Sequence, residues 1–281
     1  MNKKTRLVTV TGSRTNTLWH MLNHYRHIVD EIYVVVYEWE GVSTLKDVGE
    51  ILVNFPTAKV VRVAKKEKFN WEYVTQLYNE TKLMHPDDWW VVADDDELHI
   101  YPMPLPFMIE DCEDNGWDIV RGGFIDRIGE GGIFPEIKPY KNIFKQFPLA
   151  GFFRYPLSGA CPNKVCVMKG YIEITSGQHY AKINGETLWG PQIDNKNIAP
   201  VDKYYVQVHH FKWDSTCVER IKAVADTKKE YAFSKEYLKM YQAIRSNNFE
   251  IDINDTEFMI ENIGENEYTQ WVELFQKITL I

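Results

Sequence analysis

The sequence lacks any hydrophobic run long enough to cross a membrane. Its longest uninterrupted apolar runs are Ile32–Tyr37 and Trp89–Ala93, well short of the ~20 residues that a membrane-spanning helix needs. The basic N-terminus, MNKKTRLVTVTGS, has no apolar stretch of signal-peptide length and no small-residue cleavage site. We therefore expect a cytoplasmic protein without a transmembrane segment.

Cysteine is also scarce. The 4 cysteines show no C-x-x-C spacing and no Cys/His pairing of the zinc-finger type. This pattern predicts free, mostly buried thiols in a reducing compartment. With 281 residues, of which 44% are hydrophobic, the chain can bury a large core without disulfides or structural metals.

Basic residues are outnumbered. The 32 Lys and Arg residues face 40 Asp and Glu residues, which gives a net charge of −8. A protein dedicated to DNA binding would carry a net positive charge, although a local basic patch stays an alternative for this chain. Aromatic residues reach 14%, which suits a carbohydrate- or base-stacking site and is explained equally well by core packing.

The first hundred residues alternate strand and helix patterns. Apolar or β-branched runs predict four strands, and positions with 3.6-residue spacing predict helices between them. The predicted strands are Arg6–Thr11, Ile32–Tyr37, Lys59–Val63 and Trp89–Ala93, and the helices are 18–29, Leu45–Asn54 and a segment that starts after Asn70 and ends before Pro86. This order predicts a Rossmann-like α/β fold with an open, mostly parallel sheet and helices on both faces.

The second half of the chain has a different texture. Pro102, Pro104 and Pro106 interrupt the pattern, and short strands such as Asp118–Phe124 and Lys164–Met168 lie between Gly- and Pro-rich loops. We expect a partly antiparallel extension of the sheet there. A long helical pattern then runs from Ser215 to about Asn247, which predicts C-terminal helices.

Four consecutive acids, Asp94-Asp95-Asp96-Glu97, directly follow the strand Trp89–Ala93. Ligand sites of open α/β sheets lie at the carboxyl ends of strands, and adjacent carboxylates repel one another unless a cation offsets them. We expect Asp94 and Asp96 to bend toward one point and bind Mg²⁺ or Mn²⁺, with Asp95 facing away. The alternative is a solvated acidic turn.

Two further motifs carry polar groups at strand ends. His209 and His210 close the strand predicted at Tyr204–Val208, so one of them could complete a metal shell or touch a phosphate. Asp126 ends the strand that contains Gly122-Gly123-Phe124 and could act as a general base, or form a structural ion pair with Arg127. His20, His24 and His27 share a helix face with zinc-like spacing, but no carboxylate completes that set.

These motifs, in this order, resemble the GT-A glycosyltransferases related to family 2. The resemblance is to the bacterial subgroup whose acidic motif reads D-x-D-E-[FL], and it runs from about residue 5 to about residue 225. It is carried by His24-Tyr25-Arg26, DEIYVVVYEW, WWVVADDDELHIYP, GGFIDR, FKQFPL, NKVCVMKG, SGQHY and HHFKW. The chain would then divide into a GT-A domain, 1–225, with a nucleotide-binding half, 1–100, and an acceptor-binding half, 101–225. A helical extension, 226–281, would follow.

The resemblance also implies roles for individual residues. Asp94, Asp96 and His210 would hold the metal, and Asp126, with Glu130 behind it, would supply the inverting base. Residues of the donor site would be Thr11, Ser13, Arg14, Glu38, Asp94, Asp95, Arg127 and Lys212. The segment that starts at Glu38 departs from the common D-x-x-S-x-D-G-T pattern, which leaves the nucleotide open.

The function that follows is metal-dependent transfer of a sugar from a nucleotide-sugar, with a UDP-sugar expected, to a hydroxyl acceptor such as a glycan. A sugar-nucleotide nucleotidyltransferase would use similar acids, but it should carry a Gly-rich basic loop after the first strand, of which TGSRTNT is a poor version. A non-catalytic carbohydrate-binding module would not need the acidic run and the histidine together. Transfer to protein or nucleic acid stays open, as does the oligomeric state.

Overall fold

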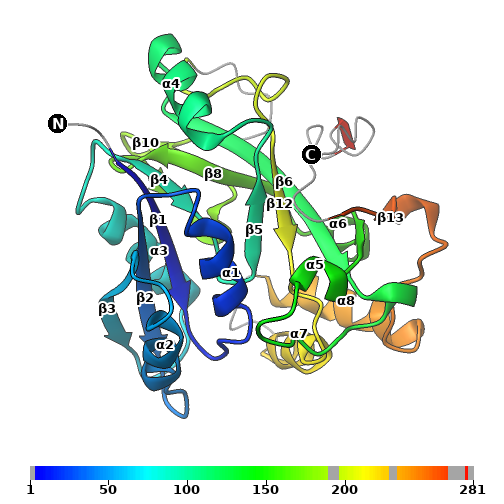
Figure 1. The fold of residues 1–281 in the computed structure, drawn as a ribbon. Helices are drawn as coiled ribbons and strands as arrows, with labels where there is room; N and C mark the ends of the chain where they lie inside the picture. The colour runs from blue at the N-terminus through cyan, green and yellow to red at the C-terminus, as the bar shows by residue number, and fades with distance from the viewer. Residues whose placement is uncertain (1–3, 189–195, 228–232, 265–275, 278–281) are drawn as a thin grey trace.

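The computed structural model describes residues 4–188, 196–227, 233–264 and 276–277 (Figure 1). Its first hundred residues form the parallel half of a large sheet, with the strand order β3-β2-β1-β4. The strands are β1 (Thr5–Thr11), β2 (Glu31–Glu38), β3 (Ala58–Lys65) and β4 (Trp89–Val92). The helices between them are α1 (Leu18–Tyr25), α2 (Leu45–Leu52) and α3 (Trp71–Lys82). This confirms the predicted Rossmann-like half.

The second half extends the sheet with mostly antiparallel pairs, as predicted. Strand β4 pairs with β8, β8 with β6, and β6 with β7, all antiparallel, whereas β12 runs parallel to β6 and antiparallel to β5. These strands are β5 (Glu97–Ile100), β6 (Ile119–Ile128), β7 (Leu149–Gly151), β8 (Asn163–Lys169) and β12 (Val206–His210). A separate small sheet contains β9 (Glu173–Ile174), β10 (Ala181–Ile183) and β11 (Glu186–Thr187).

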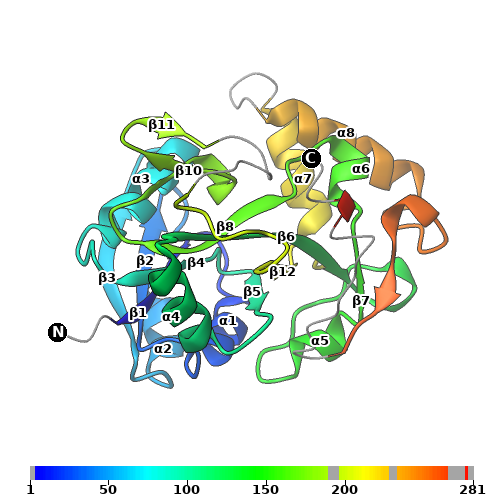
Figure 2. The same ribbon diagram turned by 90° about the horizontal axis from the view of Figure 1, so that it is seen from above.

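Helices cover both faces of the sheet (Figure 2). The largest apolar cluster joins α1, α2 and α4 (Leu105–Asn115) to one face, through side chains such as Leu22 and Met108. On the opposite face α3 and the small sheet pack against other side chains of the same strands, such as Val8 and Val35. Both faces of the parallel strands are therefore buried, which explains their nearly continuous apolar sequences.

The C-terminal part packs against the far end of β6. Helices α7 (Cys217–Asp226) and α8 (Ser234–Ser246) form an apolar cluster with Ile128 and Phe153. A short strand, β13 (Glu261–Asn262), pairs with β7 at the edge of the main sheet. The segment predicted as a separate extension, 226–281, thus adds a strand to the main sheet, and the boundary at 225 stays a prediction. Residues 228–232, 265–275 and 278–281 of that segment lie outside the described residues.

Two elements differ from the sequence-based expectation. Helix α4 begins directly after Pro104, where three prolines had indicated a break. Proline fits the first turn of a helix because the N–H it lacks would have no partner there, and Gly116 ends the helix with a left-handed φ of 71°. The long helix expected from Ser215 is two helices, α7 and α8. Within the described residues, no helix is both long and apolar enough to span a bilayer.

Candidate active site

The acidic run lies at the carboxyl ends of β4 and β1, but its three aspartates do not converge on one point. The Asp94 Oδ1 atom accepts hydrogen bonds from the Tyr78 hydroxyl (2.8 Å) and the Gln178 amide (3.0 Å). Its Oδ2 atom lies 3.6 Å from the Nζ atom of Lys164, and the side chain stays 36% exposed. Asp94 is therefore held by α3, β8 and the short helix Ser176–Gln178, and its assignment to the metal stays a prediction.

Asp95 is turned back toward the loop after β1. The Thr11 hydroxyl donates to its Oδ2 atom over 2.6 Å. Burial and the neighbouring Asp96 carboxylate raise the pKa of Asp95 above its ordinary value. Asp95 therefore lies beside Thr11 at the end of β1, and the assignment of both residues to the donor site stays a prediction.

Asp96 lies between two basic groups. Its Oδ2 atom accepts a hydrogen bond from the guanidinium of Arg14, and its Oδ1 atom lies 3.8 Å from His210 Nε2. Arg14 also donates to Asp214 Oδ2 over 2.7 Å, so it bridges the two carboxylates. Burial alone would raise the pKa of Asp96, but Arg14 lowers it well below its ordinary range. Asp96 is thus ionised at neutral pH.

His210 is fixed from behind by Asp126. Its Nδ1 atom lies 3.3 Å from Asp126 Oδ1, which also accepts a hydrogen bond from Trp213 Nε1 (3.0 Å). The other oxygen, Oδ2, accepts from the backbone N–H of Arg154 over 3.0 Å. Burial raises the pKa of Asp126, but the contacts with His210, Arg154 and Trp213 together outweigh it and lower that pKa.

These contacts bear on the role expected for Asp126, whose assignment as the base stays a prediction. The residue is only 2% exposed and both of its oxygens already accept hydrogen bonds, whereas a general base must reach the proton that it removes. Asp126 Oδ1 lies beside Nδ1 of His210, so a proton on Nδ1 would donate to it and would leave the lone pair of Nε2 facing Asp96. A carboxylate behind a histidine is the usual second shell of a metal-binding histidine.

The residues present fit a divalent cation between Asp96 and His210. The two facing atoms are 3.8 Å apart, which is less than two bonds of ~2.1 Å laid end to end. Burial lowers the pKa of His210, so its imidazole is neutral, as a ligand must be. Among the described residues no group of three or more His, Cys, Asp or Glu side chains could hold a metal. The other ligands would therefore have to be phosphate oxygens and water, as is common for Mg²⁺.

The structure does not bring every predicted site residue to this position. Arg127 is fully buried; it donates to His209 Nδ1 (2.9 Å) and to the backbone carbonyl of Ile263 (2.9 Å). It therefore ties β6 to the C-terminal segment, and its assignment to the donor site stays a prediction. Glu38 caps helix α2, because its Oε1 atom accepts the backbone N–H groups of Thr44 (2.9 Å) and Leu45 (3.1 Å).

Three other predicted residues lie at the margin. Lys212 donates to the hydroxyl of Tyr237 on α8 over 3.0 Å. Glu130 is exposed in the short helix Glu130–Gly132 beyond the end of β6. Ser13 is exposed in the loop that also carries Arg14. Their assignment to donor binding or to catalysis stays a prediction.

Sequence reasoning missed two buried charges of the site. Lys164 is fully buried on β8, and its Nζ atom lies 2.7 Å from Glu97 Oε1. Asp214 is fully buried as well and is bound by Arg14 and by Arg220. A lysine inside the apolar strand NKVCVMK was a usable signal, because a buried lysine needs a carboxylate partner. No local signal marks Asp214, whose partner Arg14 is two hundred residues away.

Comparisons with known proteins give only distant likenesses. No protein-family model matches the chain, and no curated protein matches it. Among solved structures it is similar to S. aureus TarS, with 14% identity over 90% of this chain and 46% of that chain and a TM-score of 0.37. The crystal structure of S. aureus TarS 1-349 in complex with UDP-GlcNAc is 13% identical over 90% of this chain and 77% of that chain, with a TM-score of 0.36. A 4-diphosphocytidyl-2C-methyl-D-erythritol synthase is 15% identical over 61% of this chain and 77% of that chain, with a TM-score of 0.34. Values this low assign no function, which is argued below from the site itself.

Proposed function

We propose that the protein is a metal-dependent glycosyltransferase that moves a sugar from a nucleotide-sugar, with a UDP-sugar as donor, to a hydroxyl group of a glycan. The observation that carries this proposal is the row Asp126, His210, Asp96 beside the ends of β4 and β1. In that row a carboxylate orients an imidazole, and the imidazole faces a second carboxylate at 3.8 Å. Such a pair suits a cation that also binds a diphosphate.

Each residue of the row then has a defined task. Asp96 Oδ1 and His210 Nε2 would hold Mn²⁺ or Mg²⁺, which when bound neutralises the charge on the departing diphosphate. Asp126 keeps the His210 tautomer and ring orientation. Arg14 adds a fixed positive charge on the opposite side of Asp96, where it would attract the anionic donor.

Asp94 and Lys164 would serve the sugar and not the metal. Asp94 has a partly exposed carboxylate that is oriented from the far side, by Tyr78 and Gln178. Carboxylates held in this way accept hydrogen bonds from hydroxyl groups. Lys164 stays protonated, since Glu97 and Asp94 raise its pKa against the effect of burial, and it balances the charge of the acidic run.

A thermal-shift panel tests the proposal. Wild-type protein is melted with UDP, GDP, dTDP or CMP, each with and without Mn²⁺, and the melting temperature should rise most with UDP and Mn²⁺ together, through mass action. Asp96→Ala should lose that rise, and the control Asp114→Ala, at an exposed site on α4, should keep it. A rise that does not depend on Mn²⁺, or that survives in Asp96→Ala, would contradict the metal site.

The same samples separate transfer from nucleotide synthesis. A glycosyltransferase releases UDP from a UDP-sugar when an acceptor is present. A nucleotidyltransferase releases pyrophosphate from UTP and a sugar phosphate. Release of pyrophosphate alone would replace the proposed reaction with its alternative.

A further inference from the structure

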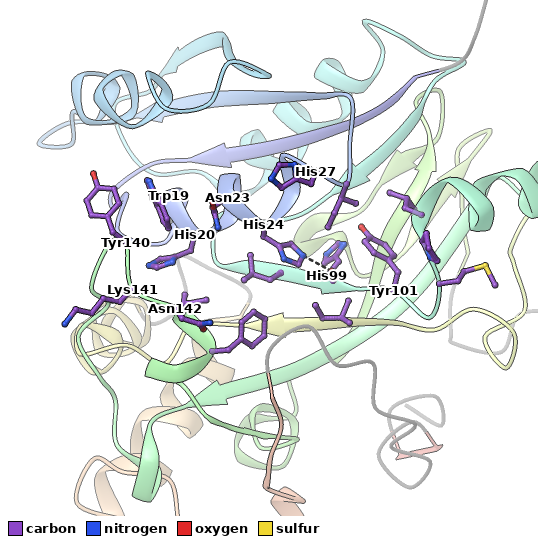
Figure 3. A pocket seen from close by; sticks show the side chains of 18 of the residues that line it. Trp19, His20, Asn23, His24, His27, His99, Tyr101, Tyr140, Lys141 and Asn142 are labelled. Atoms are coloured by element: carbon purple, nitrogen blue, oxygen red, sulfur yellow. Dashed lines mark hydrogen bonds between the residues drawn. The ribbon is translucent and has the colours of Figure 1, made fainter.

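A cleft of about 800 Å³ opens on the molecule away from the carboxylates (Figure 3). It lies between α1, β5 and residues 140–144, and none of the residues assigned to the metal or diphosphate lines it. The cleft is therefore separate from the proposed active site.

One wall of the cleft is formed by α1 and the turn that follows it. Trp19, His20, Asn23 and His24 of α1 line the cleft together with His27 of the following turn. Figure 3 shows Trp19, His20 and Tyr140 at one end and Tyr101 at the other. The sequence had indicated a zinc-like spacing for the three histidines. In the part of the chain that the structure describes, they do not form a metal-binding group, so this face needs another explanation.

The lining is almost free of charge. Among the residues that line the cleft, Lys141 is the only Lys or Arg, and there is no Asp or Glu. His20 and His24 are directed to the backbone carbonyls of Lys138 (3.2 Å) and His99 (2.9 Å). Burial lowers the pKa of His20, and it lowers that of His24 to about 4, so both rings are neutral. A phosphate or carboxylate would find few counter-charges here, which favours an uncharged ligand.

Aromatic and aliphatic side chains form much of the remaining surface. Trp19, Tyr101, Tyr140 and Phe144 line the cleft together. Tyr140 is 70% exposed, and its ring meets Trp19 edge-to-face at a centroid distance of 5.0 Å. Its backbone has a φ of 62°, a left-handed conformation that is uncommon and costly for a bulky residue. An exposed ring held in a strained conformation at the rim of a cleft points to a ligand that covers it.

We infer that this cleft is a second, non-catalytic site that binds uncharged oligosaccharides. The apolar C–H face of a pyranose ring can lie against the exposed ring of Tyr140 and the partly buried ring of Trp19. Neutral imidazole and amide groups, such as that of Asn23, pair with hydroxyl groups without requiring charge. The volume of about 800 Å³ is large enough for more than one sugar residue. This inference stands independently of the proposed transfer reaction, because it concerns different residues and predicts binding alone.

The test is direct binding of uncharged glycans to the intact protein. The protein is screened on an array of neutral oligosaccharides, and the dissociation constants of the best glycans are measured in solution by ligand-observed NMR. Tyr140→Gly removes the ring and is compatible with the φ of 62°, so the variant should fold. It should weaken binding by about tenfold or more, and Asn23→Ala should weaken it as well.

Two controls make the outcome decisive. Tyr171→Ala removes a tyrosine that is 47% exposed and does not line the cleft, so it should leave glycan binding unchanged. Added UDP and Mn²⁺ should not displace the glycan. The inference is overturned if no neutral glycan binds, if Tyr140→Gly binds as well as the wild type, or if UDP displaces the glycan, which would place binding in the active site.

Discussion

Replacing Asp126 with asparagine distinguishes the two roles that this residue can have. In the structure Oδ1 accepts hydrogen bonds from His210 and Trp213, and Oδ2 accepts one from the backbone of Arg154. Asparagine offers one acceptor oxygen and one NH₂ group. Whichever way the amide turns, the NH₂ group meets at least one N–H donor, and that donor is left unsatisfied in a buried site.

The expected losses follow from this geometry. A buried donor without a partner costs about 1–3 kcal/mol of unfolding free energy. Loss of the carboxylate behind His210 should also weaken Mn²⁺ binding by roughly 10–100-fold, as for other second-shell partners of metal-binding histidines. Turnover should fall together with metal binding and should recover partly at high Mn²⁺ concentration.

The assay measures three quantities on one preparation of Asp126→Asn: Mn²⁺ affinity by electron paramagnetic resonance, unfolding free energy by urea titration, and turnover across Mn²⁺ concentrations. Asp118→Asn, just before β6, is the control, because its carboxylate contacts the hydroxyl of Tyr171 and not the site. Unchanged Mn²⁺ affinity with a loss of turnover that no Mn²⁺ concentration restores would refute the positioning role and identify Asp126 as the general base.

Three further predictions concern the fold. The pKa of Glu38 is lowered to about 2, chiefly by the Leu45 N–H and the Lys65 side chain. The ordinary pKa of a glutamate is about 4.3. The ionised Glu38 therefore stabilises the fold by up to about 3 kcal/mol above pH 4.3, and this contribution disappears as the pH falls toward about 2. When the unfolding free energy is measured against pH, Glu38→Gln should lack this decrease between about pH 4.3 and pH 2. An unchanged decrease in the variant would assign it to other carboxylates. Gly122→Ala should lower the unfolding free energy by more than ~3 kcal/mol, because the new Cβ would lie 2.0 Å from the carbonyl oxygen of Val206. The control Gly49→Ala, in an open helical position, should raise the unfolding free energy by about 0.5–1 kcal/mol. Equal urea midpoints for the two variants would contradict the close packing of β6 and β12. Arg127→Leu should lower the unfolding free energy by about 2 kcal/mol or more, since buried carbonyls lose their donor. The variant should still bind UDP. Loss of UDP binding in a stable variant would show that Arg127 belongs to the donor site.

The sequence predicted the parallel half of the fold well because its signals are local. Buried strands such as Ile32–Tyr37 read as apolar runs, and Asn70 marks the start of α3, where its side chain accepts the backbone N–H of Tyr73. Helix α4 was missed because three prolines were taken as breaks, although two of them lie at its start. Strand β5 was missed because Glu97 was grouped with the acidic turn, whereas it begins the strand that pairs with β12.

For the site, the sequence predicted the motifs but not the directions of the side chains. Asp94 and Asp96 are two residues apart, yet one is held by Gln178 and the other by Arg14, and neither partner is near in sequence. Asp126 and His210 were both chosen, but their hydrogen bond depends on the parallel pairing of β6 with β12. Side-chain orientation in a site assembled from distant segments is a property of the packed sheet, which a local pattern does not encode.

The most direct test of the account is a crystal structure of the protein with Mn²⁺ and UDP, in which anomalous scattering locates the metal. The account predicts one Mn²⁺ within bonding distance of both Asp96 Oδ1 and His210 Nε2, with its remaining ligands supplied by the diphosphate and water. A manganese peak at Asp94, or UDP bound without any metal beside Asp96 and His210, would contradict it.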